Sequence, residues 1–377
     1  MSSFQQELLD DPQALIQADR GGLLRALAAA GSQVRRAVET LAESGIDRLR
    51  DSQTPRAVLV APDAAAPYLS SLLSALASAE APVIDWRDSN LPRWAGPADA
   101  LVVVSADGRH PRLAELVAQA DRRGMVVAVA APARSPIAAA AARHPVADVS
   151  HLASLPPRAV WWALATPALQ ALDVLGLAAT ADLLPSVADA LDSVAETDRP
   201  DSSAFTGPAK LLAAELAESV PVIAGIGRTA TVAARRFAGA VQLIGGFTAM
   251  AAALPDDVAR IGSLLEFATT EADFFADRVS EPSVRPRLVL IGDDDRWGVP
   301  HESQWDGLGD DAGRKAGSAL AGLAASRGIG SSRILVPDGP PLVRFAAASA
   351  TGDFAATYLA LARGIDPSAP RLGELPH

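Results

Sequence analysis

The sequence predicts a two-domain α/β protein in which each domain is a parallel β-sheet flanked by helices. Its 377 residues are enough for two domains of ordinary size. Short, continuous apolar runs alternate with helical stretches, which is typical of strands buried on both faces of a parallel sheet. This alternation occurs once within residues 57–129 and again within residues 209–363.

The first half opens with an expected strand at 57–60, two residues after Pro55. Helical spacing of apolar residues over 67–76 predicts the next helix. An amphipathic helix is expected over 113–123, and Gly124 would end it because glycine adopts the left-handed conformation found there. Further strands are expected at 82–84, 100–104 and 125–129.

The middle of the chain predicts helices and a linker. Residues 155–195 are rich in alanine and leucine and carry Trp161 and Trp162, and we expect two helices there. Residues 196–205 are polar and contain a proline, as linkers often are. The predicted organisation is an N-terminal helical segment (1–50), a first α/β domain (51–155), a helical connection and linker (156–205), a second α/β domain (206–350), and a C-terminal helix end and tail (351–377).

The second half repeats the pattern of the first. The acidic run Asp293–Asp295 is interpreted as part of a solvated loop, with a cation site as the less favoured alternative. Helices are expected at 209–218, 229–244, 311–327 and 342–363, and strands at 220–224, 288–291 and 334–336.

Composition excludes several classes of function. The net charge of −11 argues against a nucleic-acid-binding protein, which would present a basic face. The absence of cysteine excludes disulfides and thiolate chemistry, and no two of the five histidines are spaced i, i+4 for a helical zinc site. We therefore expect no metal and no cofactor.

The N-terminal sequence does not resemble a secretory signal, because it is acidic and lacks a basic segment followed by an apolar run. No uninterrupted apolar run approaches the length of about 18 residues that a membrane span requires. A cytoplasmic protein without a membrane partner is therefore expected.

The C-terminal sequence carries a specific resemblance. Residues 351–370 contain Gly-Asp-Phe, then Tyr-Leu-Ala, then Gly-Ile-Asp-Pro, and are followed by Glu374 and Leu375. This pattern resembles the tail of bifunctional phosphoglucose/phosphomannose isomerases, and the resemblance extends over roughly residues 50–375. It implies two sugar isomerase (SIS) domains with flavodoxin-like sheets of five strands, a homodimer, a sugar phosphate or related small anion as ligand, and a role in hexose or mannose phosphate metabolism.

The first candidate site is the segment after the strand at 100–104. It resembles the SIS phosphosugar loop Ser-x-Ser-Gly-x-Thr, in which Ser105 and Gly108 match, Asp107 replaces the second serine and His110 replaces the threonine. A carboxylate beside a phosphate is repulsive, although Arg109 could offset it. The alternative is an ordinary strand-to-helix turn in which Asp107 caps the helix.

A second candidate is Arg158, within Pro-Pro-Arg-Ala, a segment similar to one in which the isomerases direct an arginine at the active site. A guanidinium suits sugar hydroxyls or phosphate, whereas the alternative is a surface arginine at a helix start.

A third candidate is the glycine turn of the second half, formed by Gly225, Gly227, Arg228 and Thr229 at an expected helix N-terminus. Its local chemistry suits an anion better than the corresponding first-half segment 61–67, which has alanine and proline where the family has glycine. A plain tight turn is the alternative.

The family's catalytic positions are apolar in this chain. Arg236 matches an arginine in a helix of the isomerase family. Counted from it, the family's glutamate falls on Leu243, the family's lysine on Gly246 and the family's histidine on Ala259. Aldose–ketose isomerisation needs a base to move a proton between C1 and C2 and usually a group to open the ring. Each such acid–base group raises the rate about 10²–10⁴-fold, and leucine and alanine side chains can perform neither role. We name no catalytic residue and expect a phosphosugar-binding protein without standard isomerase chemistry. The alternatives are an isomerase with re-sited groups (Glu266 or Glu271 as base, His110 or His301 opening the ring) and a structural partner of a sugar-phosphate enzyme.

Overall fold

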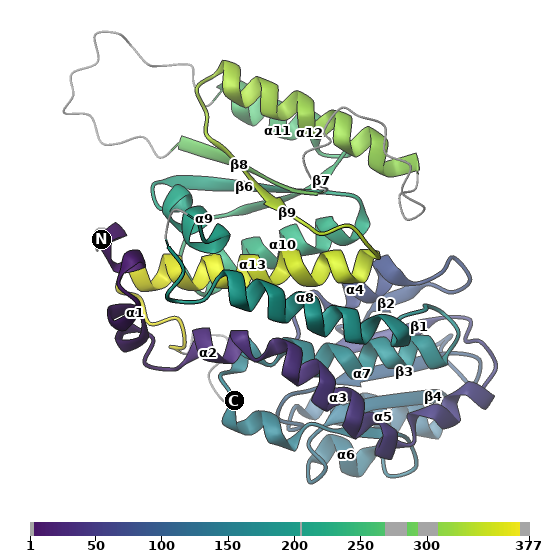
Figure 1. Cartoon of the computed structure of the whole chain (residues 1–377). Coiled ribbons are helices and arrows are strands. Elements are labelled where there is room, and N and C mark those ends of the chain that lie inside the picture. Colours follow the sequence, from purple (N-terminus) through teal and green to yellow (C-terminus); the bar gives the residue numbers. More distant parts are fainter. Residues whose placement is uncertain (1–3, 204–205, 268–284, 293–307, 370–377) are drawn as a thin grey trace. The chain divides into compact units, whose positions relative to one another are not determined.

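A computed structural model provides the structure, and it describes residues 4–203, 206–267, 285–292 and 308–369 (Figure 1). The chain forms two compact units, each with its own fully parallel sheet. The first-sheet unit comprises residues 25–193, and the second-sheet unit combines the described residues up to 24 with those of 194–369. Two parallel α/β sheets flanked by helices confirm the predicted fold class. The domain boundaries drawn from sequence remain predictions.

The first sheet has the strand order β2-β1-β3-β4-β5. This order places the topological switch point between β1 and β3, outside whose carboxyl ends ligands bind in such sheets. Pro62 pairs with Val104 at that end, so the residues that follow the two strands emerge beside each other. The strands are β1 (Val58–Pro62), β2 (Val83–Asp85), β3 (Ala100–Val104), β4 (Val126–Ala131) and β5 (Val146–Asp148).

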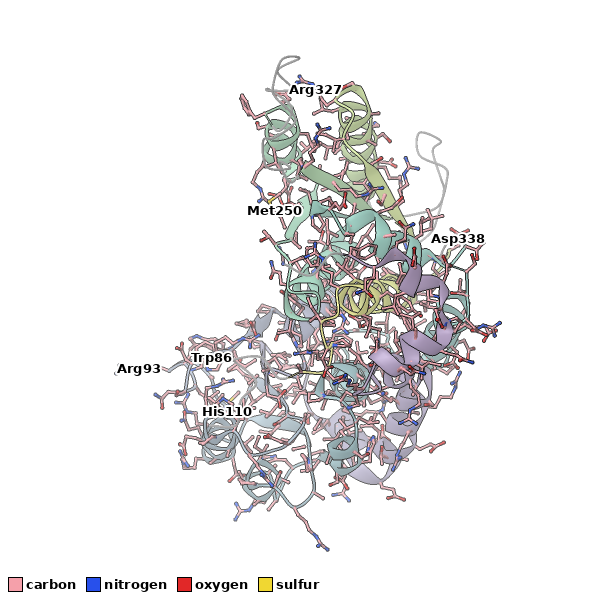
Figure 2. All side chains as sticks on the ribbon, turned by 90° about the vertical axis from the view of Figure 1, so that its left-hand side faces the viewer. Trp86, Arg93, His110, Met250, Arg327 and Asp338 are labelled. Carbon is pink, nitrogen blue, oxygen red and sulfur yellow. The ribbon has the colours of Figure 1, made fainter. Side chains whose placement is uncertain are left out.

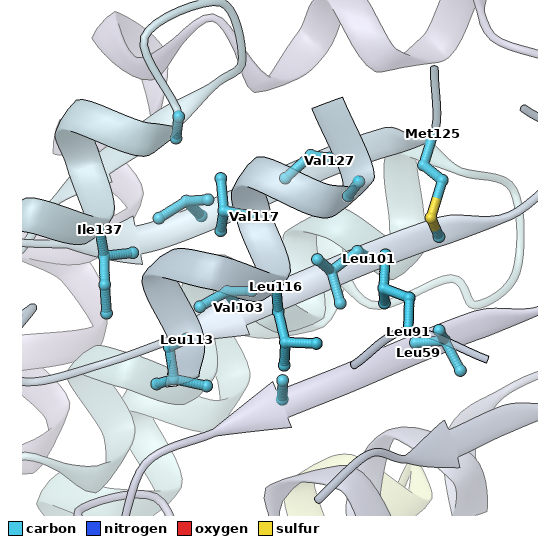
Figure 3. Close-up of a cluster of buried hydrophobic side chains, with 14 of the residues drawn as sticks. Leu59, Leu91, Leu101, Val103, Leu113, Leu116, Val117, Met125, Val127 and Ile137 are labelled. Carbon is cyan, nitrogen blue, oxygen red and sulfur yellow. The ribbon is translucent and has the colours of Figure 1, made fainter. Parts of the chain in front are cut away.

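Helices cover both faces of the first sheet. The face under α5 contains an apolar cluster in which Leu113, Leu116 and Val117 pack on side chains of β1, β3 and β4 (Figure 3). The opposite face contacts α4 and α7. The helices of this part are α3 (Ala30–Ser44), α4 (Leu69–Leu76), α5 (Pro111–Arg122), α6 (Pro136–Ala140) and α7 (Trp161–Val174), with 3-10 turns η2 (Ile46–Asp51), η3 (Ser150–Ser154), η4 (Pro157–Ala159) and η5 (Ala181–Leu183).

The second sheet has the order β7-β6-β8-β9, which repeats the first sheet without its fifth strand in the described part of the chain. The resemblance implied five strands here. The sequence pattern also missed β7, because Met-Ala-Ala-Ala-Leu lacks the β-branched residues that mark strands. It missed the three-residue β5 as well. The strands are β6 (Ser219–Ile226), β7 (Met250–Leu254), β8 (Arg285–Gly292) and β9 (Ser331–Leu335).

In the second-sheet unit, α10 and α13 cover one face of the sheet, and α11 and α12 cover the other (Figure 1). Helix α13 is buried along nearly its whole length, which fits its apolar character on all sides. The remaining bounds are η1 (Gln6–Asp10), α1 (Pro12–Ala18), α9 (Pro208–Leu216), α10 (Arg228–Leu243), α11 (Val258–Phe267), α12 (Leu308–Ser326) and α13 (Pro341–Ala362), while α2 (Leu23–Ala28) and α8 (Leu184–Thr197) carry the chain between units. No helix in the described ranges has the length and hydropathy of a membrane span.

A buried ion pair joins α10 to α13. Arg236 Nη2 donates to Asp353 Oδ2 over 2.5 Å, and the two side chains are only 7% and 9% exposed. Burial raises the pKa of Asp353, and the charge of Arg236 opposes that rise. The helices approach closely beside the pair, because a Cβ on Gly352 would lie 3.0 Å from the Phe237 ring. The aspartate and glycine of the tail motif thus serve helix packing.

Replacing Asp353 with alanine is expected to destabilise the protein by about 3–5 kcal/mol, because Arg236 would remain buried without its counter-ion. Urea denaturation of the wild type and variant measures this loss. The control is Glu196→Ala, which removes an exposed ion pair with Arg199 and should change stability very little. Equal effects of the two substitutions would contradict the assignment.

Candidate functional site

The switch point of the first sheet is bridged by a carboxylate that the sequence did not single out. Asp63 follows β1 directly, and its Oδ2 accepts the N–H of Ala106, which lies after β3, over 2.7 Å. Its Oδ1 accepts the N–H of Ala65 over 2.9 Å. A lone aspartate in an alanine-rich segment gives no signal in the sequence, since its partner lies 43 residues away.

The predicted phosphosugar loop is closed by its own side chains. The buried Ser105 accepts the N–H of Gly108 at its Oγ over 3.0 Å, and Asp107 Oδ1 accepts the N–H of Arg109 over 2.9 Å. Gly108 has φ +67°, a left-handed conformation that favours glycine. Asp107 does not cap the helix, contrary to the alternative considered above, because the N-cap of α5 is His110, which makes no side-chain capping bond.

The electrostatics of this loop disfavour a bound anion. Burial raises the pKa of Asp63, hydrogen bonds from Ala106, Ser105 and Ala65 oppose the rise, and the nearby charge of Asp107 adds to it. His110 Nδ1 is buried without a hydrogen-bond partner. His110 and Trp86 lie on the same flank of this unit (Figure 2). A phosphate entering here would meet two carboxylates.

Arg158 lies in η4, directly before α7, and is half-buried. The adjacent Trp161 and Trp162 are buried and meet edge to face, with ring centroids 5.0 Å apart. Trp161 Nε1 donates to the carbonyl oxygen of Pro67 over 2.8 Å, so α7 is bonded to the segment that follows Asp63. The tryptophan is therefore an intrinsic reporter of that segment.

The glycine turn of the second-sheet unit is built differently. A Cβ on Gly225 would lie 2.3 Å from backbone atoms of Ala230 and Thr231, so only glycine allows the end of β6 to approach α10 this closely. Gly227, with φ +82°, is the N-cap of α10 and supplies no side-chain cap. Thr231 Oγ1 donates to the carbonyl oxygen of Gly227 over 2.8 Å and stabilises the turn.

Apart from Arg158, which lies in η4 of the first-sheet unit, the predicted ligand residues fall into two sets in separate units. The first-sheet unit brings the loop of Ser105, Asp107, Gly108, Arg109 and His110 together with Asp63. The second-sheet unit holds the turn of Gly225, Gly227, Arg228 and Thr229, where Arg228 is exposed and Thr229 half-buried. The acidic run Asp293–Asp295 follows β8 and lies outside the described residues.

The positions that correspond to the family's acid–base groups offer no proton-transfer group. Leu243 is the last residue of α10 and is 38% exposed, and Ala259 is exposed on α11. Gly246 has φ +69° in the turn that follows α10. Of the alternative groups, Glu266 lies on α11 and His110 in the first-sheet unit, while Glu271 and His301 lie outside the described residues. Within the described ranges, no cluster of three His, Cys, Asp or Glu side chains is arranged to hold a metal.

Comparison with known proteins finds a family model that matches the C-terminal part of the chain. Residues 205–371 match the family model of the bacterial phospho-glucose isomerase C-terminal SIS domain. No curated protein matches the chain by sequence.

Solved structures share the two-sheet architecture over nearly the whole chain. A hypothetical protein from Thermus thermophilus is 15% identical, with a TM-score of 0.68 over 96% of this chain and 91% of that one. The C-terminal domain of glucosamine-fructose-6-phosphate aminotransferase from Francisella tularensis is 11% identical, with a TM-score of 0.57 over 92% and 97%. Tagatose-6-phosphate ketose/aldose isomerase from Escherichia coli is 11% identical, with a TM-score of 0.55 over 96% and 97%. At these identities the likeness shows the fold alone, an α/β architecture with two parallel sheets flanked by helices.

Replacing Gly225 with alanine is expected to destabilise the protein by about 1–3 kcal/mol, because the new methyl group would overlap the backbone of α10. Denaturation by urea measures the change. The matched control is Gly262→Ala on α11, where the added Cβ meets nothing within 4 Å and alanine should stabilise the helix slightly. A neutral Gly225→Ala variant would show that the close approach is not required.

Proposed function

We propose that this protein binds a sugar phosphate and does not isomerise it, because residues 205–371 match the family model of the bacterial phospho-glucose isomerase C-terminal SIS domain. The observation that carries the proposal is the glycine turn at the N-terminus of α10. The proposal extends to a homodimer acting in hexose or mannose phosphate metabolism, as the resemblance implies, and to the cytoplasmic location expected from the sequence.

Phosphate binding at the glycine turn is supported by general helix chemistry. The first N–H groups of a helix lack intrahelical acceptors, and the helix dipole favours negative charge there. Gly227 leaves these groups without a side-chain cap, and Gly225 lets the backbone fold tightly beneath them. Arg228 is exposed at the first position of the helix and can add a guanidinium. A phosphate group suits this combination.

The absence of turnover is supported by Leu243 and Ala259. Moving a proton between C1 and C2 of a sugar requires a base, and neither side chain titrates. The alternative is an isomerase with re-sited catalytic groups. Of its two candidate bases, Glu266 lies within the described residues and Glu271 does not. Glu266 is the penultimate residue of α11. The remaining predicted ligand residues, including Ser105 and Arg158, stay predictions.

Calorimetric titration with glucose 6-phosphate and mannose 6-phosphate is expected to give dissociation constants in the high-micromolar to millimolar range, about −4 to −6 kcal/mol. Arg228→Ala should weaken binding about tenfold, because a charge-assisted bond to phosphate is lost. Arg235→Ala, an exposed arginine further along α10, serves as the control and should leave binding unchanged. If no sugar phosphate binds at millimolar concentration, the binding function falls and a structural partner role replaces it.

A coupled assay for glucose 6-phosphate or mannose 6-phosphate isomerisation is expected to show no turnover above background. Isomerases of ordinary efficiency turn over at about 1–10³ s⁻¹, so the assay separates the two cases clearly. Turnover in this range would favour the re-sited isomerase. In that event Glu266→Gln, with Glu215→Gln as a control from the same unit, tests whether Glu266 is the base.

A further inference from the structure

The two units place different residues at the same structural position. In each sheet the first strand of the unit lies between the second and the third, as β1 between β2 and β3 and as β6 between β7 and β8. Asp63 is the residue directly after β1, and Gly227 is the residue directly after β6. The position at the switch point is therefore a carboxylate in one unit and a glycine in the other.

Asp63 occupies the hydrogen-bond donors that a ligand anion would use. Its two oxygens accept the N–H groups of Ala65 and Ala106, which belong to the loops on either side of the switch point. Two further N–H groups of the second loop, at Gly108 and Arg109, are bonded to the side chains of Ser105 and Asp107. The chain's own side-chain oxygens thus occupy these four N–H groups in the manner of a bound anion.

The Asp63 carboxylate is bonded at the carboxyl ends of β1 and β3 and not at the start of a helix. It does not cap the following helix, because the N-cap of α4 is Tyr68 and makes no side-chain capping bond. One of its bonds instead crosses from the loop after β1 to Ala106 in the loop after β3, and the other is made to Ala65 within its own loop. A phosphate could reach these N–H groups only by displacing a carboxylate, and would then lie next to the second carboxylate, on Asp107.

We infer that Asp63 is a specificity-determining residue: a built-in anion that excludes phosphate from the first-sheet unit, so that the chain carries a single sugar-phosphate site, in the second-sheet unit. The location of that remaining site rests on the proposed function. The exclusion by Asp63 stands on its own hydrogen bonds.

The test removes the built-in anion in two ways. Asp63→Gly reproduces the residue that follows β6, and Asp63→Asn retains the size of the side chain without its charge. Glu80→Gln is the control, because this substitution changes the net charge by the same amount. Glu80 is exposed and precedes β2, at the amino end of the same sheet. Each full-length variant is titrated with inorganic phosphate and glucose 6-phosphate by calorimetry, and its fluorescence is followed because Trp161 is bonded to the loop after Asp63.

Both Asp63 variants are expected to gain one phosphate site per chain, and phosphate should bind their first-sheet unit at least tenfold more tightly than it binds that unit in the wild type. Phosphate should also change their fluorescence, whereas the Glu80→Gln variant should show no such change. Sites rising from one to two support the inference and the proposed function together. Sites rising from zero to one support the exclusion by Asp63 but overturn binding at α10. Folded variants that gain no site overturn the inference.

A measurement on the wild type keeps the inference testable if the variants do not fold. The amide resonances of Ala106 and Gly108 should remain unmoved when phosphate is added to millimolar concentration, since their N–H groups are already bonded. Phosphate-dependent shifts of these two resonances would overturn the exclusion.

Discussion

The second-sheet unit depends on the hydrogen bonds of one buried ammonium group, that of Lys210. Its Nζ donates to the carbonyl oxygens of Leu9, Pro200 and Ser202 over 2.6–2.7 Å, so all three of its protons have acceptors. Burial lowers the pKa of Lys210, while nearby aspartates oppose that change. The unit is assembled from two separate stretches of sequence, and this one side chain binds the first stretch to the start of the second.

Asp198 continues this network within the same unit. Its carboxylate accepts the N–H of Ala209, and its backbone carbonyl accepts the hydroxyl proton of Tyr358 on α13. Burial raises the pKa of Asp198 to about 6, and the hydrogen bond from Ala209 and the charge of Lys210 oppose the rise. Together with the Arg236–Asp353 pair, these contacts fix α9, α10 and α13 on one face of the sheet and so position the N-terminus of α10.

The features that resemble the isomerases are largely those that build the scaffold. Arg236 and Asp353 pair in the core, and Gly352 allows two helices to approach. The positions that correspond to the isomerases' acid–base groups are instead Leu243, which is 38% exposed, and the exposed Ala259. The residues that resemble those of the isomerases are therefore ones that the fold requires. Substitutions in a buried ion pair destabilise a fold, whereas substitutions at exposed positions usually change stability little.

The amino-acid sequence alone was enough to predict the fold class, because continuous apolar runs such as 100–104 indicate buried parallel strands and Gly225 and Gly227 indicate a tight turn before a helix. The sequence pattern did not predict β7, because its alanines are not typical of strands. This strand forms by pairing with the edge of β6. Only the tertiary structure identified Asp63 as the partner of Ala106. Parallel strands bring together chain segments that are far apart in sequence, and local patterns record neither that proximity nor the hydrogen bonds it creates.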